Sequence, residues 1–297
     1  MKTVVVIGAG PAGCAAAVQC RRLGFDVRLF DRQGQAGGLV ANGFLIENYP
    51  GIEPPVTGPA FAARLQALLQ RFSVSVLASS VHRIEGTSHS FTVHADGETL
   101  TADAVVVATG TAPVVPDIPG VQNSDGHDGL FFEVRELERR CPAASDVVII
   151  GGGEASFDYA LTLTRMGVSV KLLCRRTQPR VHGRLAEQVA AEPLIHLQTD
   201  VQVIRLERDG ARPEVHALAG NGESLRLTCD AVLAAVGRRR SLPILPGNML
   251  PSTDALTPLP GLYICGDARL GTLGQAVMAA GDGMAAAVDI ARAGSLH

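Results

Sequence analysis

The hydrophobic positions of the chain follow the same plan twice. Residues 3–7 and 146–150 are short apolar runs, and each precedes a glycine-rich turn and a helical stretch that ends at a glycine. A second apolar strand follows each helix, at residues 26–31 and 169–174. A helix flanked by two apolar strands forms a βαβ unit, and such units build parallel sheets. The pattern therefore predicts an α/β fold with two parallel sheets.

Later in each half the spacing changes to short alternating strands separated by turn residues. These strands lie within residues 81–102 in the first half and 201–229 in the second. Each run is followed by an apolar strand that ends at a glycine, at residues 105–110 and 232–237. A βαβ unit with an antiparallel meander explains both halves, and predicts two Rossmann-like three-layer ββα domains.

The last apolar segment, residues 261–291, contains one strand and one helix, and is too small to stand alone. It is therefore expected to rejoin the first half, which makes the second half an inserted domain. Two proline-rich stretches, residues 111–120 and 238–247, are typical of linkers. The predicted domains are an outer one of residues 1–114 and 245–297, and an inserted one of residues 115–244.

Composition excludes several classes of protein. The net charge is −3, which gives no electrostatic case for nucleic-acid binding. No apolar run approaches the roughly 20 residues that span a bilayer. The apolar run after Lys2 is short and ends in a glycine turn, so it indicates a buried first strand rather than a signal peptide. A cytoplasmic location is expected.

No two of the six cysteines form a C-x-x-C motif, and their spacing matches neither a disulfide framework nor a zinc site. Most are expected to be small buried apolar residues. The six positions are Cys14, Cys20, Cys141, Cys174, Cys229 and Cys265.

The first glycine turn has the spacing G-x-G-x-x-G, at Gly8, Gly10 and Gly13. Its glycines allow a tight turn, a close approach to a pyrophosphate, and close packing of helix and strand. Asp31 ends the next strand, where an acid that binds a ribose hydroxyl belongs. The turn therefore predicts a site for FAD or NAD; the alternative is a turn that serves packing alone.

The second turn has Gly151, Gly153 and a small residue, Ser156, in the third place. Its second strand leads into arginines at positions 175, 176 and 180 instead of an acid. Arginine favours a ribose 2′-phosphate through charge-assisted hydrogen bonds, so this turn predicts an NADPH site. The alternative is a solvated arginine face. Two such sites in one chain predict a relay in which NADPH gives a hydride to a flavin.

With these motifs in order, the chain resembles the low-molecular-weight thioredoxin reductases and related pyridine-nucleotide flavoprotein reductases. The shared motifs are GAGPAG (8–13), the glycine pair 37–38, IENYPG (46–51), ATG (108–110), GGGEAS (151–156), RR-x-x-x-R (175–180), GLYICGD (261–267) and GQAVMAAGDG (274–283). The resemblance implies FAD in the outer domain, NADPH in the inserted domain, and a homodimer.

The resemblance also implies which residues hold each cofactor. For FAD they are Gly8, Gly10, Pro11, Ala12, Gly13, Asp31, Gly38, Leu39, Asn48, Ala108, Thr109, Gly110, Gly266, Asp267, Gln275 and Ala276. Gly266 and Asp267 match the pair that holds the flavin's ribityl chain. For NADPH they are Gly151, Gly153, Glu154, Ala155, Ser156, Arg175, Arg176 and Arg180.

The chain departs from the thioredoxin reductases at the redox motif. Those enzymes carry C-x-x-C, Asp-Gly and aromatics before the second glycine turn, whereas this chain has SDGHDGLFF (124–132). In one register Ser124 and His127 fill the two cysteine positions; a register counted back from the glycine turn differs, and neither supplies a C-x-x-C. Gly274 replaces the arginine that precedes Gln-Ala in that family.

The same region resembles another branch, the ferredoxin–NADP reductases of the thioredoxin-reductase type, which lack these cysteines. GLFFEV (129–134) and VVIIGGGEASFDYA (147–160) match that branch, whereas IENYPG matches the disulfide-reducing one. That branch typically carries a C-terminal extension, which is absent here because the chain stops at His297.

His127 is the candidate catalytic residue, as a proton donor to the reduced flavin; a surface loop histidine is the alternative, and the favoured one. Cys141 is the candidate thiol, since Arg139 and Arg140 precede it, but without a resolving partner it is expected to be inert. Cys265 adjoins the flavin motif, and a core-facing strand cysteine is the default interpretation.

The sequence therefore predicts an NADPH-dependent FAD oxidoreductase that passes electrons from the flavin directly to an acceptor, either a small carrier protein or a small oxidant such as a quinone. An arginine cluster is a candidate docking surface for an acidic carrier, or a solvated face: Arg139, Arg140, Arg238, Arg239 and Arg240. Three alternatives stay open: a ferredoxin or flavodoxin–NADP reductase, a disulfide reductase whose cysteines pair only in the fold, and a non-catalytic nucleotide-binding regulator.

Overall fold

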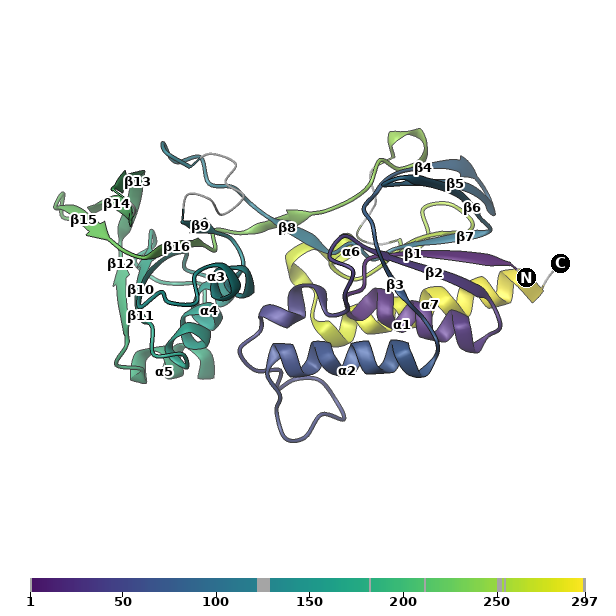
Figure 1. The fold of residues 1–297 in the computed structure, drawn as a ribbon, viewed down its shortest axis with the longest axis horizontal. Helices are drawn as coiled ribbons and strands as arrows, with labels where there is room; N and C mark the ends of the chain where they lie inside the picture. The colour runs from purple at the N-terminus through teal and green to yellow at the C-terminus, as the bar shows by residue number, and fades with distance from the viewer. Residues whose placement is uncertain are drawn as a thin grey trace. The chain divides into compact units, whose positions relative to one another are not determined.

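The structure, a computed structural model, describes residues 2–121, 129–181, 183–210, 212–249, 253 and 255–295. The chain divides into two compact units. Unit 1 consists of residues 1–41, 45–112 and 238–297, and unit 2 of residues 42–44 and 113–237. Each unit has its own parallel sheet and its own small antiparallel sheet (Figure 1).

The sheet of unit 1 has five parallel strands in the order β18-β7-β1-β2-β3. Strand β1 lies at its centre and is buried on both faces. Val4 and Val6 pack on the helical side, and Val5 and Ile7 pack on the meander side. The strands are β1 (Thr3–Ile7), β2 (Asp26–Asp31), β3 (Val76–Ala78), β7 (Ala104–Val107) and β18 (Leu262–Ile264).

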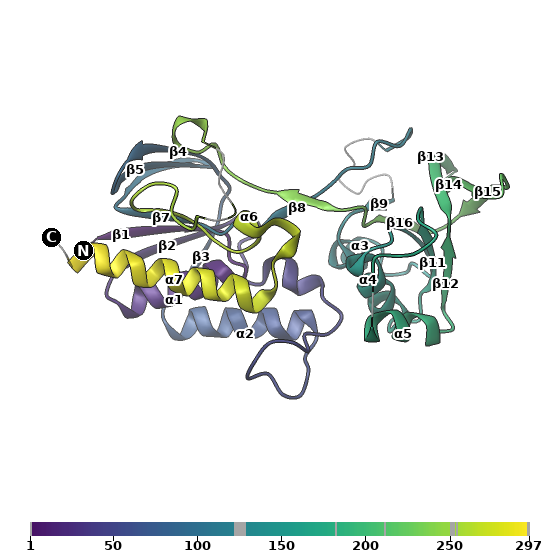
Figure 2. The same cartoon turned by 180° about the vertical axis from the view of Figure 1, so that it is seen from behind.

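Helices cover one face of this sheet and an antiparallel meander covers the other. The helices α1 (Pro11–Arg22), α2 (Gly58–Arg71) and α7 (Ala276–Ser295) lie together in both views (Figures 1 and 2). The meander consists of β4 (Val81–Thr87), β5 (Ser90–Ala95) and β6 (Glu98–Ala102). This is the three-layer ββα arrangement that the sequence predicts.

Local sequence explains where the first helix begins and ends. Pro11 opens α1, a position where the missing N–H costs nothing and the fixed φ suits a helix. Gly24 follows the helix with φ +87°, a conformation that favours glycine, and the Phe25 N–H returns to the Cys20 carbonyl. Gly167, with φ +80°, follows α4 (Glu154–Thr164) in a similar way, and the Val168 N–H returns to the Leu163 carbonyl. Both predicted glycine stops are confirmed.

Unit 2 repeats this arrangement around a five-stranded parallel sheet in the order β12-β11-β10-β16-β9. Val147 and Ile149 of its central strand pack on the helices, and Val148 and Ile150 pack on the meander side. The sheet consists of β9 (Leu130–Phe131), β10 (Asp146–Ile150), β11 (Ser169–Cys174), β12 (Ile195–Thr199) and β16 (Ala231–Ala234). The helices are α3 (Val134–Arg140), α4 and α5 (Arg184–Ala191), and the meander is β13 (Val201–Asp209), β14 (Arg212–Ala219) and β15 (Ser224–Thr228).

The two segments predicted as linkers contain short strands. β8 (Thr111–Pro113) and β17 (Arg238–Arg240) pair with each other in a two-stranded sheet. Arg238 strengthens the pairing, because its guanidinium donates to Thr111 Oγ1 at 2.8 Å and to the Thr111 carbonyl at 2.9 Å. The remaining short elements are η1 (Gly38–Asn42), η2 (Pro246–Asn248), α6 (Asp267–Leu270) and η3 (Gly271–Leu273).

Within the described residues, no helix combines the length and the apolar character needed to cross a membrane.

Candidate functional site

The glycine turn between β1 and α1 is shaped by close backbone packing and leaves space at its centre. A Cβ on Gly8 would lie 2.3 Å from the Ala108 carbonyl oxygen, and a Cβ on Gly13 would lie 1.7 Å from the Gly8 carbonyl oxygen. The nearest heavy atom to a Cβ on Gly10 is 4.0 Å away, the carbonyl oxygen of Gly37. The opening over Gly10 faces the start of α1, where helical N–H groups lack partners within the helix. Pro11 and Ala12 form that helical start.

Asp31 lies at the end of β2, beside this turn, and binds backbone amides. Its Oδ2 accepts the Ala9 N–H at 2.9 Å and its Oδ1 accepts the Gln33 N–H at 2.8 Å. The carboxylate therefore fixes the glycine turn, and its remaining lone pairs can accept further hydrogen bonds.

Further predicted FAD residues meet the turn at the carboxyl edge of the sheet in unit 1. Gly38 approaches Gly10 so closely that a Cβ on Gly38 would lie 3.2 Å from the Gly10 Cα. Leu39 follows it in η1. The segment 108–110 follows β7, and its Ala108 packs against Gly8. Within this segment the hydroxyl of Thr109 donates to the Ser241 carbonyl, and a Cβ on Gly110 would meet no atom within 4 Å.

The predicted ribityl pair, Gly266 and Asp267, follows β18 at the same edge. A Cβ on Gly266 would lie 3.1 Å from the Cβ of Ala12 and 3.1 Å from the Cβ of Ala279, so the pair sits between the starts of α1 and α7. Burial raises the pKa of Asp267, and the nearby charge of Arg238 opposes this rise. The structure thus brings the glycine turn, segment 108–110 and Asp267 to one edge.

Gly274 is explained by Asp267. A Cβ on Gly274 would lie 1.9 Å from Asp267 Oδ1, so any side chain there would displace this carboxylate. The next residue, Gln275, accepts a hydrogen bond from the Asn48 side-chain amide at 3.1 Å, and Ala276 begins α7. Asn48 and Gln275, 227 positions apart, are therefore in direct contact.

An ion pair between Arg269 and Asp282 was not found from the sequence. Arg269 donates to both carboxylate oxygens of Asp282 at 2.7 to 3.1 Å, and both side chains are largely buried. Asp282 Oδ2 also accepts the Gly266 N–H at 2.9 Å. The pair therefore fixes the backbone just before Asp267. In the sequence, Asp282 is an acid within the otherwise apolar stretch of α7. Its role can be recognised only when the structure shows that α7 lies beside the end of β18.

The second glycine turn, in unit 2, has the same construction. A Cβ on Gly151 would lie 2.5 Å from the Ala235 carbonyl oxygen, whereas a Cβ on Gly153 would meet nothing within 4 Å. Ser156 is fully buried and its hydroxyl donates to the Gly153 carbonyl at 2.7 Å. Glu154 and Ala155 are exposed at the start of α4, facing the open side of the turn.

The three predicted NADPH arginines follow β11 in unit 2 and are exposed. The Arg180 N–H donates to the Gly152 carbonyl at 2.6 Å, which places this residue against the glycine turn. The carbonyl of Arg176 accepts the Asp200 N–H at 3.1 Å. Within the described residues, the side chains of Arg175, Arg176 and Arg180 have no carboxylate partner. The cluster therefore offers uncompensated positive charge beside the second turn.

All six cysteines are described, and each is a free thiol. Five are buried, and burial raises the pKa of Cys14 and of Cys20 to about 12 and that of Cys229 to about 11. Burial also raises the pKa of Cys265, although the residue adjoins the flavin motif. Cys141 is half-buried, and burial raises its pKa against the opposing charge of Arg140. A thiol with a raised pKa is a poor nucleophile at neutral pH.

His127, the candidate proton donor, lies outside the described residues, as does Ser124. The structure shows the chain again from Gly129, just before β9. The candidate role of His127 therefore stays a prediction.

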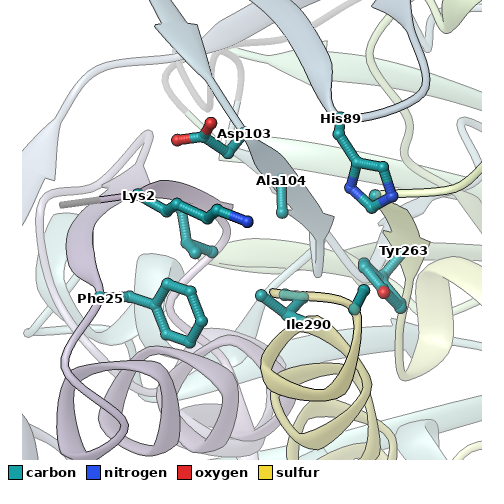
Figure 3. Close-up of a pocket in the computed structure, with 10 residues that line it drawn as sticks. Lys2, Phe25, His89, Asp103, Ala104, Tyr263 and Ile290 are labelled. Atoms are coloured by element: carbon teal, nitrogen blue, oxygen red, sulfur yellow. The ribbon is translucent and has the colours of Figure 1, made fainter. Parts of the chain in front are cut away.

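A cavity of about 140 Å³ lies at the opposite edge of the sheet in unit 1, where its parallel strands begin (Figure 3). Its lining includes Lys2, Phe25, His89, Asp103, Tyr263 and Ile290. None of the predicted cofactor residues lines it, so it is separate from the glycine turn.

The fold and the two turns define a nucleotide-dependent oxidoreductase, and comparison with known proteins gives the family. Residues 2–287 match the family of pyridine nucleotide-disulphide oxidoreductases. The chain belongs to this family, whose thioredoxin reductases use FAD and NADPH.

Within the family, the chain is similar to the thioredoxin reductase of Mycolicibacterium smegmatis. The two are 28% identical over 97% of this chain and 95% of that protein. Among solved structures, the thioredoxin reductase of Lactococcus lactis has a TM-score of 0.85 and 26% identity, over 99% of this chain and 98% of that one. The thioredoxin reductase of T. acidophilum has a TM-score of 0.87 and 25% identity over both full lengths.

Proposed function

We propose that the protein is an NADPH-dependent FAD oxidoreductase that passes electrons from the flavin directly to an acceptor, without a protein disulfide. The observation that carries the proposal is the state of its thiols. The sequence has no C-x-x-C, and all six cysteines are free, five of them buried. The raised pKa values of Cys14, Cys20 and Cys265 also argue against a thiol relay.

The residues of unit 1 suit FAD. The turn at Gly8–Gly13 has room over Gly10 for a pyrophosphate and presents the start of α1 to it. We assign Asp31, at the end of β2, to the adenosine ribose, and Asp267, a partly buried carboxylate, to the polyol chain of the flavin. When bound, FAD would supply hydride acceptance and one- or two-electron donation.

The residues of unit 2 suit NADPH. The space over Gly153 has no neighbouring heavy atom within 4 Å, and α4 begins at the next residue. Arg175 and Arg176 would bind a 2′-phosphate through charge-assisted hydrogen bonds, since neither has a carboxylate partner within the described residues. An NADH-specific site would instead place an acid there.

The proposal includes a homodimer and a cytoplasmic location, which rest on the family. Exposed apolar side chains on α7, namely Val277, Met278 and Met284, offer an apolar surface to a second copy.

His127 remains the candidate proton donor. The acceptor class is a small carrier protein or a small oxidant.

An anaerobic NADPH titration of the purified flavoprotein, followed by its visible absorbance, tests the proposal. Direct transfer predicts complete flavin bleaching at about one NADPH per flavin, because each NADPH carries two electrons and the flavin holds two. A requirement for about two would reveal a disulfide that is reduced first, and would overturn the proposal. Absence of bleaching with both nucleotides bound would instead indicate a non-catalytic regulator.

A further inference from the structure

Three side chains that can ligate metals meet on the outer face of the meander in unit 2. Glu207 of β13 lies opposite Glu214 of β14, and His216 follows two positions along β14, so all three project from the same side of the sheet. Val215 and Ala217, which alternate with them, pack into the core on the other side. The three ligand atoms lie within 4.8 Å of one another.

The contacts of His216 are short, but neither has the alignment of a good hydrogen bond. Its Nε2 lies 2.7 Å from Glu214 Oε1 and 3.1 Å from Glu207 Oε2, and this buried nitrogen directs its N–H squarely at neither oxygen. A hydrogen bond requires the N–H to point at its acceptor, so the two oxygens must flank the ring nitrogen's axis. Ligands around one ion have this relation, because each points at the metal and lies roughly 3 Å from its neighbours.

The charges near the cluster leave room for a cation. Two carboxylates directly opposite on neighbouring strands repel each other unless positive charge lies between them. Arg226 approaches Glu214 at 2.7 Å and Arg205 pairs with Glu207, but these side chains are 69% and 59% exposed. A bound cation would supply the positive charge that these exposed side chains now provide, so both arginines can then turn into solvent. Glu214, at 4% exposure, stays in place.

We propose that Glu207, Glu214 and His216 bind one divalent transition-metal ion, of which Zn²⁺ matches the donor set best. One imidazole nitrogen and two carboxylate oxygens are ordinary zinc ligands, and three protein ligands leave a position for water. The site belongs to the meander and uses none of the residues assigned to FAD or NADPH. It therefore stands independently of the proposed function.

The internal repeat supplies a matched control in unit 1. There, Arg83 lies opposite His94 and Glu85 lies opposite Thr92, in the register that relates Arg205 to His216 and Glu207 to Glu214. His94 Nε2 lies 3.3 Å from Glu85 Oε2, as His216 lies near Glu207. A threonine thus stands where unit 2 has its second glutamate. Unit 1 has two of the three ligands and is expected to bind the ion weakly.

The experiment is isothermal titration of ZnCl₂ into the purified FAD-containing protein in a non-chelating buffer at neutral pH. We expect one equivalent to bind to the wild type, and its affinity to fall at least about 10-fold in H216N and in E214T, which copies unit 1. H94N is the control, and it should bind like the wild type. Bound Zn²⁺ should also raise the unfolding temperature of wild type and H94N, but not of H216N.

Two results would overturn the proposal. One is the absence of stoichiometric Zn²⁺ binding to the wild type. The other is binding that persists in H216N and E214T, including binding that disappears only when Cys141 is alkylated, which would place the ion on a thiol. If E214T folds poorly because Glu214 is buried, H216N decides the matter, since the His216 side chain is 26% exposed.

Discussion

Asp158 is a partly buried carboxylic acid on α4 that has no role in the proposed electron transfer. Burial raises its pKa to about 6, even though the Phe44 N–H, which donates to Oδ2 at 2.8 Å, and the charges of Arg135 and Arg165 oppose the rise. A raised carboxyl pKa means that the folded state holds the proton more tightly than the unfolded chain does. The stabilisation is complete below the ordinary value of 3.8 and is lost as the pH rises through about 6.

We therefore expect D158N to be more stable than the wild type at pH 7.5 and similar to it near pH 4. The amide oxygen can still accept the Phe44 N–H, and the asparagine carries no buried charge. The difference between a pKa of about 6 and the ordinary 3.8 sets an upper bound of about 3 kcal/mol on this gain in unfolding free energy. Urea unfolding at several pH values measures the difference.

D230N is the control for D158N, with the opposite sign. The N–H groups of Ser145 and Asp146 lower the pKa of Asp230, so its contribution is present at neutral pH and is lost as the pH falls. D230N should therefore lose stability at pH 7.5. An unchanged pH dependence of stability in D158N would show that Asp158 is not the acid responsible.

At the scale of elements, the sequence predicts the strands and turns whose patterns lie within a few consecutive residues. The continuous runs of valines and isoleucines identify β1 and β10, and the glycines after them identify the two turns, because each signal spans a few positions. The structure confirms the fold class on this basis. It also explains Gly8 and Gly151, whose missing side chains make way for the carbonyls of Ala108 and Ala235.

Contacts between residues that are far apart in the chain could not be predicted from the sequence. The pairing of β8 with β17 was missed because proline-rich segments carry no strand periodicity, and Arg238 finds Thr111 across 127 positions. The two-residue strand β9 is too short to show a pattern. Asp31 accepts hydrogen bonds from backbone amides, and Asp282 accepts one from the Gly266 amide besides its pair with Arg269; such amides leave no signature in the sequence.

Substitutions in the segment after β11 test the assignment of the NADPH site. We expect R175A and R176A each to raise the KM for NADPH by about 10- to 100-fold, since each removes a charge-assisted contact with the 2′-phosphate. The KM for NADH should stay the same, because NADH has no such phosphate. Steady-state assays with both nucleotides and a small-molecule acceptor measure the ratio.

R139A is the matched control for these two variants, because Arg139 is an exposed arginine of α3 in the same unit. It should leave both KM values unchanged. Equal losses for NADPH and NADH in R176A would show that the arginines act on a part common to both nucleotides. The interpretation of this loop as a 2′-phosphate site would then be wrong.

At the scale of the whole molecule, the cysteines are spread over both units, and burial keeps most of their thiols from reacting. Cys14, Cys20 and Cys265 lie in the core of unit 1. In unit 2, Cys174 and Cys229 are buried, and Cys141 is the one thiol of the six with intermediate exposure. A redox pair needs two accessible thiols of which one forms a thiolate readily, and this distribution provides none.

We therefore expect an aromatic disulfide reagent to modify at most about one thiol of the native flavoprotein rapidly, and six after denaturation. In C141S the fast reaction should disappear, which would assign it to Cys141.

Alkylation of the native protein should leave NADPH-driven flavin reduction unchanged, because the proposed route involves no sulfur. Rapid reaction of two thiols, with loss of electron transfer to the acceptor, would instead favour a disulfide reductase whose cysteines meet only in the fold. Stopped-flow absorbance follows both reactions on the same sample, so thiol accessibility and electron flow are compared directly.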